Sequence, residues 1–157
     1  MASPNFKDSE FVVTNTGLPN NLPDTFILNR DVLCRQLQKI RDYVGRPVVI
    51  NSAFRSPAVN KAVGGVKNSR HLTCLAADIV CPSLPVLSFL CEVLNSTAIL
   101  SKIIIEPSWL HVEVDFRLEN SSLFFGSDDR PSYLINEVYS GQLLQLSNFR
   151  YMVNRFK

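Results

Sequence analysis

Apolar residues recur with helical spacing in two stretches of the chain. The first is expected to begin at a cap on Asn29 and to end at Gly45, and its apolar face consists of Leu33, Leu37, Ile40 and Val44. The second is expected over 84–95, with Ser83 as its cap. A brief helix is expected between them at 56–63, before the Gly64-Gly65 turn.

Short apolar runs at 48–50, 76–81 and 103–105 predict strands, and 109–114 predicts another. In the last of these, Trp109, His111 and Glu113 share one face, while alternate apolar residues share the other. This alternation is informative because it puts a histidine on the polar face of a strand.

Helices precede and separate the strands without a regular βαβ rhythm. This order favours an α+β fold on a small, mostly antiparallel sheet, with the helices packed on one side. The chain of 157 residues is long enough for one domain, and no repeat or linker divides it. We expect a single domain over 1–157, with its core motifs in 11–115 and a C-terminal extension, 117–157, packed on the same domain.

The formal net charge of +2 gives no argument for a nucleic-acid partner or a membrane surface. The N-terminus, MASPNFKDSE, lacks the apolar run of a secretory signal, and no stretch approaches a membrane span. We therefore expect synthesis in a cytosol, no membrane insertion, no nucleic acid as partner, and a monomer.

Four cysteines, at positions 34, 74, 81 and 91, show no CxxC pairing. In a reducing compartment they are expected to pack as small buried side chains. Cys74 is the one that lies nearest to the candidate chemistry in the sequence.

His71 and His111 are the two histidines of the chain, and Asp78 lies on the strand that follows His71. Two imidazoles and a carboxylate are chemically sufficient for a catalytic zinc site that leaves a fourth position open. Further carboxylates lie nearby at Glu106 and Glu113. Spacing alone leaves two interpretations open: a metal site, or two histidines with ordinary polar partners.

The run NSAFRSPAVNKAVGGVKNSRHLTCLAADI, residues 51–79, resembles the zinc D-alanyl-D-alanine carboxypeptidase family and its phage-encoded endopeptidase relatives. That family typically shows SGYRSP at the end of a strand, a VGG turn, then S-x-H-x-x-G-x-A-x-D. A later W-x-H is matched by Trp109-Leu110-His111. The resemblance covers residues 11–115 and implies the hedgehog/DD-peptidase type of fold.

The resemblance implies roles for particular residues. His71, Asp78 and His111 match the three zinc ligands, so Zn²⁺ is the expected cofactor. Arg55 matches the arginine that binds a substrate carboxylate or carbonyl, and it is also expected to stabilise oxyanion charge. Ser69 matches a serine that touches substrate, and the side chain of Trp109 is expected to wall the pocket.

The sequence departs from the family pattern at two positions. Well-known members carry the acidic general base three residues before the last histidine, where this chain has Ser108, which cannot act as a base at neutral pH. Glu106, at the end of the preceding strand, is the favoured replacement and Glu113 the reserve. Cys74 stands where the family usually has glycine, so its thiol is expected either to pack or to approach the zinc.

The resemblance implies hydrolysis of D-alanine-containing stem or cross-link peptides of bacterial peptidoglycan. It leaves open whether the cut is terminal or internal, and it suggests a phage or prophage endolysin-type enzyme that reaches the wall after release or delivery. One alternative is a catalytically inactive zinc module that binds wall peptides or a protein. Another is that residues 149–157 form a tail that binds nucleic acid or wall polymer. An amphipathic segment packed on the domain is the simpler interpretation of the same residues.

Overall fold

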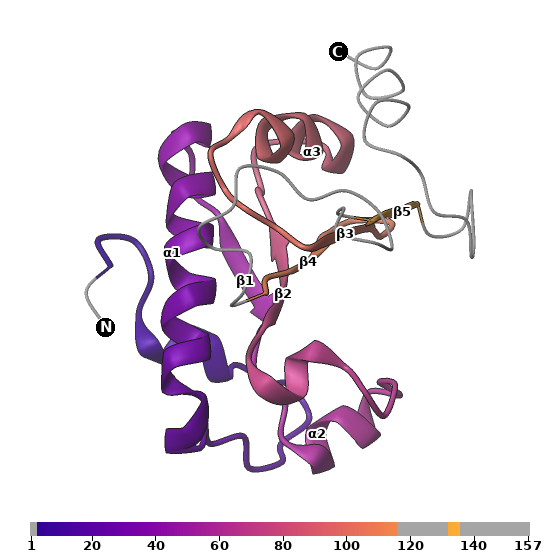
Figure 1. Cartoon of the computed structure of the whole chain (residues 1–157). Coiled ribbons are helices and arrows are strands. Elements are labelled where there is room, and N and C mark those ends of the chain that lie inside the picture. Colours follow the sequence, from indigo (N-terminus) through magenta and orange to yellow (C-terminus); the bar gives the residue numbers. More distant parts are fainter. Residues whose placement is uncertain (1–2, 116–131, 136–157) are drawn as a thin grey trace.

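The computed structural model describes residues 3–115 and 132–135, and these form one mixed sheet with helices (Figure 1). The helical elements are η1 (Asp8–Val12), η2 (Asp24–Phe26), α1 (Ile27–Val44), α2 (Pro57–Ala62), η3 (Arg70–Thr73) and α3 (Val86–Asn95). The strands are β1 (Val49–Ser52), β2 (Ala76–Val80), β3 (Lys102–Ile105), β4 (Leu110–Glu113) and β5 (Ser132–Ile135).

The sheet has the strand order β1-β2-β4-β3-β5. The pairs β1–β2, β2–β4 and β4–β3 are antiparallel, whereas β5 pairs with β3 in parallel. The predicted α+β class with a mostly antiparallel sheet is therefore confirmed. Strand β5 was not predicted, and it lies within the C-terminal extension at 117–157.

Helices α1 and α3 pack on one face of the sheet, and α2 lies near one end (Figure 1). The strand alternation explains this arrangement, because Ile103 and Ile105 of β3 point into the core with Leu110 and Val112 of β4. The intervening residues are only partly buried and belong to the opposite face. The helices thus cover the apolar face and leave the polar face to the candidate site.

The start of α1 differs from the prediction, whereas its end agrees with it. Asn29 is not the cap: η2 leads directly into the helix, and the Asn29 amide donates to the Thr73 carbonyl at 2.9 Å. Gly45 does end the helix, with φ +67° and its N–H bonded to the Arg41 carbonyl at 3.1 Å.

The other two helices show how proline affects a helix start. Ser56 caps α2 by accepting from the Val59 N–H, and Pro57 occupies the first turn. Ser83 is not the cap of α3, which begins only at Val86. Pro85 is extended, with ψ 153°, so the helix cannot start before it.

Several predictions fall partly or wholly on residues outside the described part of the chain. Of the extension at 117–157 only β5 is described, so the packing of this segment on the domain stays a prediction. The segment 149–157 lies outside entirely. Among the described residues, no helix combines the length and the apolar character that crossing a membrane requires.

Candidate metal centre

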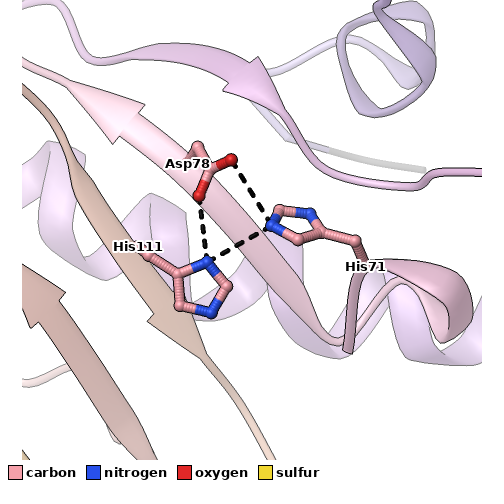
Figure 2. Close-up of side chains that lie close together, drawn as sticks. All are labelled: His71, Asp78 and His111. Carbon is pink, nitrogen blue, oxygen red and sulfur yellow. Dashed lines mark hydrogen bonds and ion pairs between the residues drawn. The ribbon is translucent and has the colours of Figure 1, made fainter. Parts of the chain in front are cut away.

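His71, Asp78 and His111 come together from three elements on the polar face of the sheet (Figure 2). Asp78 on β2 and His111 on β4 are direct partners in the strand register. His111 Nδ1 lies 2.9 Å from Asp78 Oδ1 and 3.2 Å from His71 Nε2. The sequence prediction that these residues converge therefore agrees with the structure.

His71 is held by the backbone of its own turn. The Ser69 hydroxyl caps η3 and accepts from the His71 N–H at 3.3 Å, and the His71 carbonyl accepts from the Arg55 N–H at 3.0 Å. The residue is 1% exposed. Ser69 was predicted to touch substrate. Its hydroxyl also stabilises the turn that carries His71.

The Ala53 carbonyl determines which nitrogen of His71 faces the cluster. His71 Nδ1 lies 2.6 Å from this oxygen, and a carbonyl only accepts hydrogen bonds. Nδ1 therefore carries the proton, and in the neutral ring the lone pair lies on Nε2. Nε2 faces Asp78 Oδ2 at 3.4 Å, so a lone pair and a carboxylate oxygen point into the same space, which favours a cation there.

Both ring nitrogens of His111 face carboxylates. Nδ1 contacts Asp78, and Nε2 lies 3.0 Å from Glu113 Oε1. Burial alone would lower the pKa of His111, but the hydrogen bonds to these carboxylates outweigh it and raise the pKa to about 9. Burial would likewise raise the pKa of Asp78, yet the hydrogen bond from His111 and the electrostatic interactions with both histidines hold it well below its usual range.

Arg55 contacts the carboxylate oxygen of Asp78 that His111 does not contact. Its Nη2 donates to Asp78 Oδ2 at 2.7 Å, and its Nε donates to the Ser52 hydroxyl at 3.0 Å. The Ser52 contact orients the guanidinium group, and the guanidinium group in turn holds Asp78 Oδ2 in place through a charge-assisted hydrogen bond. Arg55 was predicted as a substrate-binding residue. The structure adds a contact with a candidate ligand, and Nη1 can still donate to a substrate.

The three side chains fit a zinc ion. One ligand atom from each lies within 4.8 Å of the other two. Two imidazoles and one carboxylate form a typical catalytic zinc set with an open position. Each ligand is also oriented by a second partner: the Ala53 carbonyl for His71, Arg55 for Asp78 and Glu113 for His111.

A cavity of about 660 Å³ opens over this cluster. Its lining includes the predicted residues Arg55, Ser69, Glu106, Trp109 and Glu113, together with the three candidate ligands. Glu106 comes directly after β3 and two residues beyond Ile104. Strand alternation therefore puts the side chains of both residues on this face. Ser108 is exposed in the turn between β3 and β4 and is not among the residues that line the cavity.

Cys74 packs in the core and does not join the metal cluster. Its side chain is fully buried, and burial raises the pKa of the thiol to about 12, so it stays protonated. Its φ of +59° explains why glycine suits this position. The other three cysteines are also free and buried, as predicted.

Sequence reasoning missed three groups near the site. The Ala53 carbonyl is backbone and leaves no side-chain signal. Ser52, which accepts from Arg55, follows a register irregularity in β1 that periodicity does not reveal. Lys102 could have been found, because strand alternation puts it on the face of Ile104; its Nζ lies 3.7 Å from Glu113 Oε1.

The sequence model of the Peptidase M15 family matches residues 4–113, which is more than half of the chain. A search of curated proteins found no match. The matched segment contains the three candidate ligands and the three elements that carry them, and M15 peptidases are zinc-dependent. The chain therefore belongs to the M15 family of zinc metallopeptidases.

Proposed function

We propose that this protein hydrolyses peptide bonds in D-alanine-containing stem or cross-link peptides of bacterial peptidoglycan. The observation that supports catalysis most directly is the shared cavity of Glu106 and the three candidate ligands. A metal set with an open position, facing a carboxylate across a cavity, is the arrangement that hydrolysis requires.

His71, Asp78 and His111 would hold the zinc ion. When bound, zinc supplies Lewis acidity, which polarises the scissile carbonyl and makes water a better nucleophile at neutral pH. We assign Glu106 as the general base that takes the proton from the attacking water and passes it to the leaving amine. Glu113 is the weaker candidate for this role because its carboxylate orients the imidazole of the candidate ligand His111.

Arg55 contributes twice in this proposal. Its Nη2 and Nε orient Asp78 and bind Ser52, and its remaining N–H groups donate to a substrate carbonyl or carboxylate. Arg70 and Lys102 also line the cavity. All three cations are also paired with carboxylates, Arg55 with Asp78, Arg70 with Asp115 and Lys102 with Glu113. The proposal that the substrate carries a carboxylate therefore rests on the remaining donors of Arg55 and on the resemblance.

The proposed setting of this activity rests on the resemblance of residues 51–79 to phage-encoded endopeptidases. We propose a phage or prophage enzyme that acts on the wall as a monomer after release or delivery. Comparing lysis of bacterial cells by protein added from outside with digestion of purified peptidoglycan would test this setting.

The test of the activity is Glu106→Gln in zinc-loaded protein. We expect muropeptide hydrolysis to fall by at least about 10²-fold, since general bases contribute about 10²–10⁴-fold, while bound zinc stays at one per chain. Glu92→Gln, on α3 across the core, is the control and should retain full activity. A wild-type protein that binds zinc and muropeptides without cleaving them would instead support the inactive binding module.

A further inference from the structure

A second cavity of about 540 Å³ adjoins the metal cavity, and Arg55 lines both. It lies between the N-terminal loop, strand β1 and helix α2. Its other lining residues are Val13, Thr14, Asn15, Ile50, Asn51, Ser52, Val59 and Val63. Its volume falls in the range of small-ligand pockets, about 300–1,000 Å³.

One wall of this cavity is fixed by a buried asparagine. Asn20 is 7% exposed, and its amide nitrogen donates to the carbonyls of Val12 and Phe54 at 3.0 and 2.9 Å. Its side-chain oxygen accepts from the Ser56 N–H at 2.7 Å. These bonds join the N-terminal loop to the segment that carries Arg55 and starts α2, so the cavity is a built feature with fixed walls.

The two cavities differ in charge. The metal cavity is lined by several acidic and basic side chains, whereas Arg55 is the one charged residue among the described residues that line the second cavity. The remaining lining is valine and isoleucine with neutral hydroxyl and amide groups. Such a surface suits uncharged side chains and the polar backbone of a peptide.

Strand β1 adds a means of backbone recognition. In the described sheet it pairs with β2 alone, so it is an edge strand, and its residues Ile50, Asn51 and Ser52 line the cavity. The edge of a sheet presents N–H and C=O groups that can bind an extended peptide.

We infer that the substrate-binding groove continues from the metal cavity past Arg55 into the second cavity, which binds uncharged residues of the same peptide. The peptide then contacts the protein over more residues on the Arg55 side of the scissile bond than the metal cavity alone can bind. This inference takes its substrate class from the proposed peptidase function.

The test uses capped peptides that share one scissile bond, either short or extended by two alanines at the N- or the C-terminal end. Extension at one of the two ends should raise kcat/KM at least tenfold. Val63→Trp and Thr14→Trp, on opposite walls, should abolish that gain and leave the short peptide within twofold of wild type. Both positions are exposed, so tryptophan can be introduced there without disturbing the core. The matched control is Val49→Trp, because Val49 is 41% exposed and lines neither cavity.

A binding measurement separates failure of the inference from failure of the proposed function. Acetyl-Ala-Ala-Ala-amide is titrated into zinc-loaded protein while amide NMR signals are followed. Shifts at Asn15 and Val59 that vanish in Val63→Trp support the second subsite, even if wall peptides resist cleavage. The absence of shifts there, or tryptophan variants that slow short and long peptides equally, would overturn it.

Discussion

Each candidate ligand makes a contact with a second group that orients it. For His111 this group is Glu113, which also lies near Lys102 across the β3–β4 pair. A carboxylate that accepts from the distal imidazole nitrogen sets the tautomer and the ring orientation of a metal ligand. At the residue scale, the account therefore gives Glu113 a positioning role and Glu106 the proton-transfer role.

Substitution of Glu113 tests this division of roles. Glu113→Ala removes the acceptor and should weaken zinc binding about 10–100-fold, whereas Glu113→Gln keeps a side-chain oxygen and should lose less. Zinc titration against a competing chelator measures both. If neither variant changes zinc affinity and Glu113→Gln abolishes turnover, Glu113 is the general base and the assignment to Glu106 is wrong.

The raised pKa of His111 predicts how pH affects the metal-free protein. Its folded pKa of about 9 exceeds the ordinary imidazole pKa of 6.5, so protonated His111 stabilises the fold. This contribution is complete below about pH 6.5 and is lost as pH rises through about 9. The free energy of unfolding should therefore decrease across this range.

Zinc affinity should change in the opposite direction, because the metal must displace the proton from His111. Over the same range it should rise by up to about tenfold per pH unit. Denaturant unfolding and zinc titration at several pH values from 6 to 9 measure the two trends. A zinc affinity that stays constant between pH 6.5 and 9 would show that His111 is not the protonated ligand.

At the scale of elements, the Gly64-Gly65 turn shapes one wall of the metal cavity. Gly64 has φ +73°, and a Cβ added at Gly65 would overlap the side-chain oxygen of Asn60. Asn60 is buried, and its amide nitrogen donates to the Val66 carbonyl at 3.0 Å. The turn thus needs glycine for two different reasons.

We expect Gly65→Ala to reduce the free energy of unfolding by about 1–3 kcal/mol through overpacking. In an Asn60→Ala background the same substitution should cost clearly less, because its clash partner is gone. Urea denaturation of the four proteins in this cycle provides the measurement. Equal costs in both backgrounds would show that the Asn60 contact is not the cause.

Sequence patterns predicted elements well where local rules decide the structure. Gly45 ends α1 because its backbone adopts a left-handed conformation, and the alternation in β4 separates His111 from the core. The caps at Asn29 and Ser83 were wrong because neighbouring turns decide where each helix begins. Strand β5 was missed because a parallel pairing with β3, distant in sequence, leaves no local signal.

On the scale of the whole molecule, the helices cover one face of the sheet and the charged groups occupy the other. The candidate ligands could be predicted because the motif around His71 and Asp78 is long and specific. The contacts by which Arg55 and the Ala53 carbonyl orient the ligands could not be predicted, because both groups reach the cluster only through folding of the segment after β1. The central claim is that two imidazoles and an aspartate bind zinc on this polar face.

X-ray absorption spectroscopy of the zinc-loaded full chain tests that claim most directly. The account predicts one zinc per chain with nitrogen and oxygen neighbours at about 2.0–2.2 Å, including two imidazoles, and no sulfur at about 2.3 Å. His111→Ala should remove one imidazole from the spectrum or abolish binding. A sulfur neighbour from Cys74, or an unchanged spectrum in the His111 variant, would contradict the account.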